Sequence, residues 1–212
     1  MAGLVDTLRT IERAPLRTVR FSDIKPLARN VWRVLDDLVE HGALIRLAHG
    51  VYTSPPGGRD GRTWKPDLET GGLAIATARH GNRQAILMGI GAARHWGAIP
   101  RALGNTTVAV PSAGRAPVTT GSGTVHFIPR NLDRLAAALE QTELGPALVT
   151  TRAQTLFDLL LRPRQGEEPE AAAEAARNLR PQVDASDFDD VISAATRSSP
   201  AVRAIAAELA AR

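Results

Sequence analysis

The sequence predicts a mixed α/β (α+β) protein, in which a small helical module with a β-hairpin precedes a larger α/β domain that has a helical C-terminus. Apolar residues recur at helical spacing up to about residue 41, and two short apolar runs then flank Gly50. Farther along, strand-like runs alternate with helical segments. We expect the module over residues 1–58, a linker over 59–66 and the α/β domain over 67–212.

Two helices are predicted at the start of the module. The first covers residues 3–13, and Pro15 ends it. Ser22 can cap a short second helix that runs to about Leu27. The apolar positions that define these helices are Leu4, Val5, Leu8 and Ile11 in the first, and Phe21 and Ile24 in the second.

A third helix is predicted over about Ala28–His41, and Gly42 supplies its stop. Arg29 and Arg33 lie four residues apart, opposite the apolar side, where a helix faces solvent or a DNA groove. Trp32 flanks the apolar side and is expected to pack into the core. The apolar side itself consists of Val31, Val34, Leu35, Leu38 and Val39.

Two short strands around a tight turn complete the module. Residues 43–47 alternate between apolar and polar, and Val51–Thr53 returns after a turn in which Gly50 offers the positive φ that tight hairpins need. Pro55–Gly58 ends the unit. The order of helix, short helix, longer helix and hairpin is that of a winged helix-turn-helix.

The larger domain shows a less regular pattern of elements. Residues Ala85–Trp96 form a buried strand or helix, and the Pro/Gly/Ser-rich stretch 111–123 separates two predicted strands. Those strands are Thr107–Val110 and Thr124–Ile128. Helices are predicted over Thr70–His80, Asn131–Gln141, Ala153–Leu161 and Ala171–Leu179. Two more helices follow, one capped by Ser186 and one that starts at Ser199-Pro200.

Positive charge is concentrated in the module. The net charge of +4 divides into +3 for residues 1–63 and +1 for the remainder, and residues 13–33 alone carry +5. Such a basic stripe is typical of a surface that binds a polyanion, although charge alone slightly favours a solvated face. No apolar stretch is long enough to span a membrane, and the first residues lack the apolar core of a secretory signal, so we expect a cytoplasmic protein.

The predicted fold assigns a role to each basic residue of the module. A recognition helix enters the major groove with its N-terminal residues nearest the bases. Arg29 and Arg33 are therefore expected to donate to guanine and Asn30 to pair with adenine. Arg46 and His49 of the hairpin are expected near the DNA backbone or the minor groove.

Three further cations, Arg17, Arg20 and Lys25, are expected to neutralise phosphates, which positions a protein without reading sequence. Negative charge at Asp36, Asp37 and Glu40 limits how far the third helix lies against phosphate and favours docking through its N-terminal end. The alternative is a winged helix used only for protein contacts.

Little in the sequence indicates catalysis. The chain has no cysteine, which excludes disulfides, thiol nucleophiles and cysteine-ligated zinc. His80, His95 and His126 are scattered without ligand spacing, so we expect no metal and no cofactor. The run Gly89-Ile90-Gly91 lacks the remaining residues of a nucleotide-binding loop and fits close helix packing better. Asp158, on an apolar helix, is expected to cap or pair within the fold; a catalytic role is the alternative.

Four segments resemble the AbiEi-family antitoxins of AbiE-type (type IV) toxin–antitoxin systems. The first is LDDLVEHG followed by GALIRLAHGVYT, which ends at Thr53, and it resembles the family's winged helix. The others are ILMGIGAARHWG at 86–97, TVAVP at 107–111 and VTTRAQTLFDLLL at 149–161. The sequence departs from the family at residues 22–28, because Pro26 falls where the second helix would normally continue.

The resemblance implies a DNA-binding antitoxin without enzymatic activity. Such a protein would repress its own operon by binding inverted repeats in double-stranded promoter DNA, and it would counteract a nucleotidyltransferase-like toxin. Two alternatives come from other classes of protein. One is a winged-helix regulator whose larger domain senses a small ligand, and the other is an enzyme that acts on a nucleotide or nucleic acid through residues 64–165.

Overall fold

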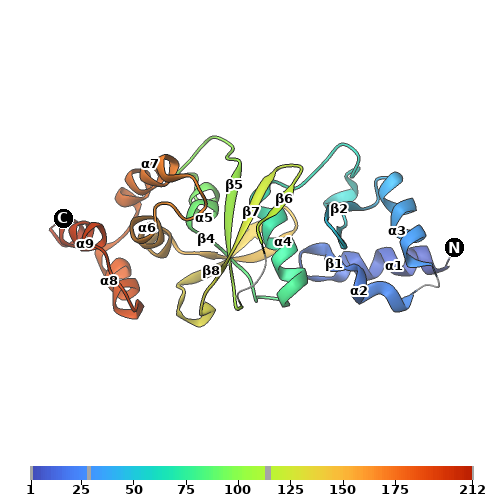
Figure 1. The fold of residues 1–212 in the computed structure, drawn as a ribbon, viewed down its shortest axis with the longest axis horizontal. Coiled ribbons are helices and arrows are strands. Elements are labelled where there is room, and N and C mark those ends of the chain that lie inside the picture. The colour runs from blue at the N-terminus through green and yellow to red at the C-terminus, as the bar shows by residue number, and fades with distance from the viewer. Residues whose placement is uncertain (1, 28–29, 113–115, 212) are drawn as a thin grey trace.

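The computed structural model describes residues 2–27, 30–112 and 116–211 of the chain. The molecule is elongated, with its termini at opposite ends, as Figure 1 shows. A helical module with a small sheet lies at the N-terminal end, a larger sheet lies in the middle, and a group of helices forms the C-terminal end. The α+β class predicted from the sequence is therefore confirmed.

The module has the element order of a winged helix-turn-helix. Its helices pack around one apolar core that includes Ile11, Leu35 and Tyr52. Its three strands pair antiparallel in the order β1-β3-β2. The elements are α1 (Ala2–Arg13), η1 (Pro15–Arg17), β1 (Thr18–Arg20), α2 (Phe21–Ile24), η2 (Lys25–Leu27), α3 (Val31–Glu40), β2 (Ile45–Ala48), β3 (Val51–Thr53) and η3 (Pro56–Gly58).

The start of the second helix differs from the prediction. Helix α2 begins at Phe21, and Arg20 rather than Ser22 is its N-cap residue. After one turn the chain tightens into the 3₁₀ helix η2, which contains Pro26. A proline ring removes one backbone donor and crowds the preceding turn, so a longer α-helix is unfavourable here. Residues 18–20, not predicted as a strand, form β1 because they pair with β3.

The third helix ends where the sequence predicts. Helix α3 stops at Glu40, and Gly42 follows with a φ of +72°, a conformation that favours glycine. A Cβ atom at Gly42 would also overlap the Asp60 carboxylate. The segment after the β2–β3 hairpin therefore folds back against the end of α3.

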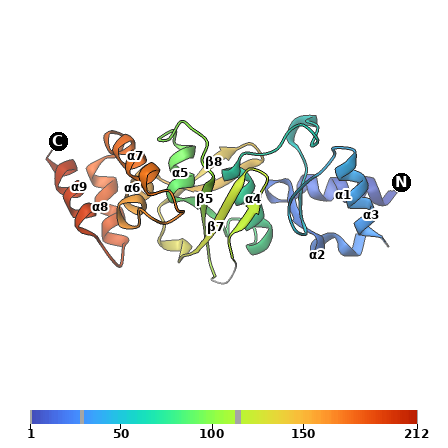
Figure 2. The same cartoon turned by 45° about the horizontal axis from the view of Figure 1, so that its top comes forward.

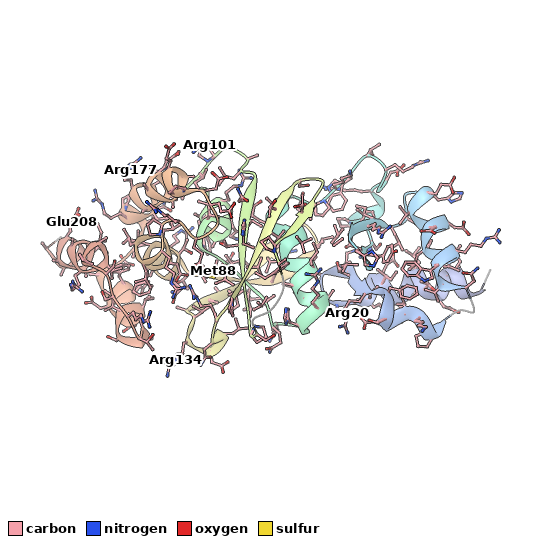
Figure 3. The ribbon with its side chains drawn as sticks, in the orientation of Figure 1. Arg20, Met88, Arg101, Arg134, Arg177 and Glu208 are labelled. Carbon is pink, nitrogen blue, oxygen red and sulfur yellow. The ribbon has the colours of Figure 1, made fainter. Side chains whose placement is uncertain are left out.

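The central domain contains a six-stranded mixed sheet in the order β6-β7-β5-β4-β9-β8. Strands β5 and β7 are parallel, as are β4 and β9, whereas β4 and β5 are antiparallel. Met88 lies at the centre of the molecule, fully buried (Figure 3). The elements are α4 (Leu68–His80), β4 (Ile86–Met88), α5 (Gly89–His95), β5 (Asn105–Val110), β6 (Val118–Thr120), β7 (Gly123–Pro129), η4 (Leu132–Arg134), β8 (Ala137–Thr142) and β9 (Gly145–Thr150).

Two predictions for this domain need correction or refinement. The helix predicted over Asn131–Gln141 is wrong: the segment is a 3₁₀ turn followed by strand β8. Pairing of β8 with β9, itself not predicted, outweighs the helical spacing of the leucines, and Leu139 is 51% exposed. The segment 85–96, predicted as a buried strand or helix, contains both: the strand β4 and then the helix α5.

Glycine at position 91 serves helix packing, as predicted. A Cβ atom there would overlap the Thr106 hydroxyl on β5 and would lie 2.7 Å from a methyl group of Leu87. Helix α5 can therefore approach the sheet only because this side chain is absent.

Four helices stack at the C-terminal end, as Figure 2 shows. They share an apolar core that contains Phe157 and Phe188, whose rings meet edge to face at 6.5 Å. The helices are α6 (Arg152–Leu161), α7 (Pro169–Leu179), α8 (Ala185–Ala194) and α9 (Pro200–Ala210), with the 3₁₀ turn η5 (Arg180–Gln182) after α7. Ser199 caps α9 as predicted, whereas Ser186 lies inside α8 instead of capping it.

The module packs directly on the central domain. Leu16 is buried in the apolar cluster of that domain, and Leu47 and Trp64 pack against the same cluster. Gly61, within the predicted linker, donates its backbone N–H to Gly42 at 2.8 Å. These contacts give the wing and the sheet a defined relative position. Among the described residues, no helix has the length and apolar character needed to cross a bilayer.

Candidate nucleic-acid interface

The exposed side of α3 is the centre of the candidate interface. Val31, Leu35 and Leu38 are buried on its inner side. The exposed residues of α3 lie on the opposite side of the helix: Trp32, Arg33, Asp36 and Glu40. The side that faces solvent therefore carries positive charge at its N-terminal end and negative charge in its later turns. Only the N-terminal end is electrostatically suited to approach phosphate.

Arg33 is the cation best placed for DNA contact. Its side chain is exposed, and no residue in the described part of the chain accepts a hydrogen bond from its guanidinium or pairs with it. It lies in the first turn of α3, the part of a recognition helix that approaches base edges. A free guanidinium here retains both donors needed for a bidentate contact with guanine.

Asn30 occupies the N-cap position of α3. Its Oδ1 accepts from the backbone N–H of Arg33 at 3.4 Å. A bidentate contact with adenine uses the same oxygen as an acceptor. The capping bond and the predicted base contact therefore compete, and the structure gives Asn30 a role in starting the helix. Arg29, predicted as its basic neighbour, lies outside the described residues.

Trp32 does not pack into the core as expected. Its ring is 44% exposed and stacks on Phe21, with centroids 3.9 Å apart and planes 17° from parallel. The stack joins α2 to the first turn of α3 and leaves a flat aromatic surface beside Arg33. The helical spacing of the sequence could not reveal this, since Trp32 lies at the border of the apolar side.

Of the three residues predicted to contact phosphate, only Lys25 is free to do so. It is exposed in η2 and forms no ion pair with a described residue. The Arg17 guanidinium donates to the Ser54 carbonyl, the Ser54 hydroxyl and the Pro55 carbonyl at 3.0–3.2 Å, so it ties η1 to the end of the wing. Arg17 therefore serves the fold of the module.

Arg20 is also engaged within the module, although it lies on the surface (Figure 3). Its Nε and Nη2 donate to the two carboxylate oxygens of Asp23 at 3.2 and 2.8 Å. These hydrogen bonds raise the pKa of Arg20. The pair presents little net charge, and a phosphate would have to displace Asp23 to reach this guanidinium.

The wing presents its two predicted residues together. Arg46 and His49 are both exposed, and Arg46 Nη2 lies 3.2 Å from His49 Nδ1. A β-bulge separates Arg46 from Ala48, and Gly50 turns the chain with a φ of +67°. The Gly50 carbonyl accepts from the Phe21 N–H at 2.8 Å. That bond fixes the tip of the wing against the start of α2.

Comparison with solved structures shows a likeness that extends over nearly the whole chain. The RV2827C protein from Mycobacterium tuberculosis superposes with a TM-score of 0.63 at 18% sequence identity, over 99% of this chain and 76% of that chain. No protein-family model matches the chain. No curated protein matches it either. At this identity the likeness shows a shared fold alone, over the module and the larger domain together.

Proposed function

We propose that this protein binds double-stranded DNA through its winged helix-turn-helix and reads sequence with the N-terminal end of α3. The observation that carries the proposal is the exposed guanidinium of Arg33, in the first turn of a capped helix, which has no partner among the described residues. Lys25 in η2 and Arg46 in β2 supply positive charge for the DNA backbone. The acidic later turns of α3 are compatible with end-on docking.

Within this function, the segments shared with AbiEi-family antitoxins support a more specific role. The protein would repress its own promoter at inverted repeats and counteract a nucleotidyltransferase-like toxin, without enzymatic activity of its own. Both actions belong to the cytoplasm, where the promoter and the toxin would be found. In this proposal the module serves repression, and the larger domain serves neutralisation of the toxin.

Binding to upstream DNA tests the first part. Purified protein is titrated onto its own upstream DNA and onto a shuffled duplex, with Arg33→Ala as the variant and Arg203→Ala, an exposed arginine on α9, as the control. We expect the Arg33 variant to lose about 1–3 kcal/mol on the specific site and little on the shuffled one. Equal binding by both variants and the parent protein would show that α3 does not read DNA.

Co-expression tests the second part. A nucleotidyltransferase-like gene next to this one is expressed alone, with the parent protein and with Arg33→Ala. We expect both forms to restore growth, while only the parent protein represses a promoter fusion, because toxin neutralisation is assigned to the other domain. Failure of both forms to restore growth would overturn the antitoxin role and leave DNA binding standing.

One observation favours a ligand-responsive regulator as the second candidate. An arginine-rich cavity with a buried carboxyl group lies among the C-terminal helices. A regulator of this kind would bind DNA equally well and would not rescue cells from a toxin. The same co-expression experiment therefore separates the two candidates.

A further inference from the structure

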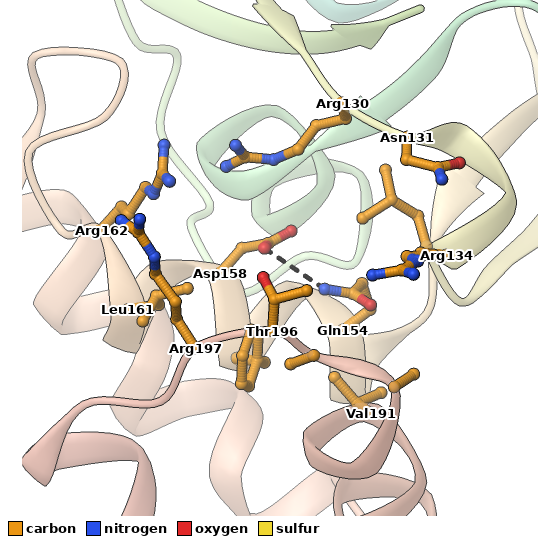
Figure 4. Close-up of a pocket in the computed structure, with 14 residues that line it drawn as sticks. Arg130, Asn131, Arg134, Gln154, Asp158, Leu161, Arg162, Val191, Thr196 and Arg197 are labelled. Atoms are coloured by element: carbon orange, nitrogen blue, oxygen red, sulfur yellow. Dashed lines mark hydrogen bonds between the residues drawn. The ribbon is translucent and has the colours of Figure 1, made fainter.

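A cavity of about 400 Å³, shown in Figure 4, lies between the segment that follows β7 and the helices α6 and α8. Three separate segments form it: the chain just after β7, helix α6, and the end of α8 with the residues that follow. Four arginines line it, namely Arg130, Arg134, Arg162 and Arg197. Asp158 is its acidic member. The lining therefore carries a clear excess of positive charge.

Asp158 is unusual for a carboxyl group in such surroundings. It is only 6% exposed, and its Oδ2 has no hydrogen-bond partner among the described residues, while Oδ1 accepts from Gln154 Nε2 at 3.3 Å. Burial raises the pKa of Asp158 to about 7, because the opposing effects of Arg130, Gln154 and Arg162 do not offset the loss of water. Near neutral pH the group exists substantially as the carboxylic acid, which has a proton to donate.

The arginines around Asp158 form few hydrogen bonds or ion pairs with other described residues. Arg130 donates to Gln165 at 3.2 Å, and in Figure 4 its guanidinium lies above the Asp158 carboxyl group. Burial lowers the pKa of Arg130, and the like charge of Arg162 lowers it further. No described arginine forms an ion pair with Asp158. Guanidinium groups in this arrangement repel one another, and a bound anion would remove that repulsion.

Part of the remaining wall of the cavity is apolar, beside the polar side chains of Asn131, Gln154 and Thr196. Leu135 from the segment before β8, Phe157 and Leu161 from α6, and Val191 from α8 all contribute to the lining. A cavity of this size, with apolar side chains beside converging charged and polar groups, is suited to a small molecule. The apolar walls suit an organic group that is attached to the anion.

We propose that this cavity binds a small phosphate-bearing organic molecule, with its phosphate among Arg130, Arg162 and Arg197 and its apolar part against Phe157 and Val191. The guanidinium forks match the oxygens of a phosphate monoester. Asp158, in its protonated form, donates to a phosphate oxygen through Oδ2, which gives that atom the partner it lacks in the free protein.

Calorimetric titration of the full-length protein with three probes tests this site: AMP, inorganic phosphate and adenosine, all at equal ionic strength. We expect AMP to bind most tightly, phosphate more weakly and adenosine least, since charge-assisted hydrogen bonds hold the phosphate and the walls hold the base. Arg197→Ala and Arg162→Ala should each weaken AMP binding about tenfold or more. Arg203→Ala, on α9 outside the cavity, should bind AMP as the parent protein does.

Three results would overturn the proposal: no heat with any probe, adenosine binding as tightly as AMP, or loss of AMP binding that is equal in the Arg197 and Arg203 variants. Circular dichroism confirms that each variant folds, and Arg197, exposed after α8, is the substitution least able to disturb the core. A fourth result would assign the surface to nucleic acid: weaker binding of unrelated DNA by the Arg197 variant with no response to AMP or phosphate. Specific promoter binding through α3 is independent of all four.

Discussion

The two ends of the molecule use arginine in opposite ways. At the N-terminal end, Arg33 projects from a convex helix surface into water, without a described partner. At the other end, Arg130 and Arg162 line a concavity around a buried carboxyl group. A projecting charge can meet an extended polyanion such as DNA, whereas charges that line a concavity are suited to a small anion. Surroundings, more than residue type, therefore decide which ligand an arginine serves.

The largest expected effect is the loss of stability when Leu35, in the core of the N-terminal module, is shortened. Leu35 is fully buried against Ile11, Ile24 and Tyr52. Leu35→Ala should reduce the free energy of unfolding by about 2–5 kcal/mol, from lost apolar burial and the cavity left behind. Urea denaturation measures this. Leu139→Ala is the matched control, since Leu139 is 51% exposed and its removal should change stability by about 0.5 kcal/mol or less.

Leu35→Ala also separates the two ends functionally. Promoter binding should fall with the stability of the module, while AMP binding at the other end should persist as long as the larger domain stays folded. If AMP binding fell in parallel with promoter binding, the two ends would not be independent.

Because of Asp158, which lines the cavity, the free energy of unfolding should depend on pH. The pKa of Asp158 is about 7 in the folded protein against an ordinary value of 3.8. Between these values the folded state keeps a proton that the unfolded state has lost, so the free energy of unfolding falls as pH rises through this window. Over about three pKa units the loss amounts to up to about 4 kcal/mol.

Asp158→Asn should remove this dependence, because an amide stays neutral at every pH and its oxygen can still accept from Gln154. The variant should be more stable than the parent protein at pH 8 and similar to it at pH 4, in urea denaturation without phosphate. Parallel pH profiles for the two proteins would show that Asp158 is ionised in the fold at neutral pH.

The projecting end could largely be predicted from the sequence, because its determinants are local. Helical spacing placed Leu35 inward and Arg33 outward, and Gly42 marked the end of the helix. The stack of Trp32 on Phe21 could not be predicted, since it depends on how two helices meet. The same holds for Arg17 and Arg20, whose charges are engaged by Ser54 and Asp23.

The enclosed end could hardly be predicted at all. Arg130, Asp158 and Arg197 are far apart in the sequence, and only folding of the 3₁₀ turn η4 and helices α6 and α8 brings them together. The helix predicted over Asn131–Gln141 would have placed this turn elsewhere. The sequence shows Asp158 as a polar residue on an apolar helix, but only the structure shows that its Oδ2 has no partner among the described residues.

Lys25 and Arg20, both in the N-terminal module, should differ in their contribution to the salt dependence of DNA binding. Lys25 forms no ion pair with a described residue, whereas Arg20 is paired with Asp23. If Lys25 contacts a phosphate, Lys25→Ala should reduce the slope of log affinity against log salt by about 0.9. Arg20→Ala should change the slope less, because the charge it removes is already compensated. Fluorescence anisotropy at several salt concentrations measures both, and equal changes would mean that DNA displaces Asp23 from Arg20.

The smallest expected effect is a change in promoter affinity when an acidic charge is removed from the later turns of α3. Asp36 is exposed one turn after Arg33, where its charge opposes the approach of phosphate. For a charge about 10 Å from a phosphate in water, Coulomb's law gives about 0.4 kcal/mol, so Asp36→Asn should strengthen promoter binding about twofold. The gain should shrink as added salt screens the charge. Glu40→Gln, one turn farther from the N-terminal end, should gain less if docking is end-on, whereas an equal gain would mean that the helix lies along the groove.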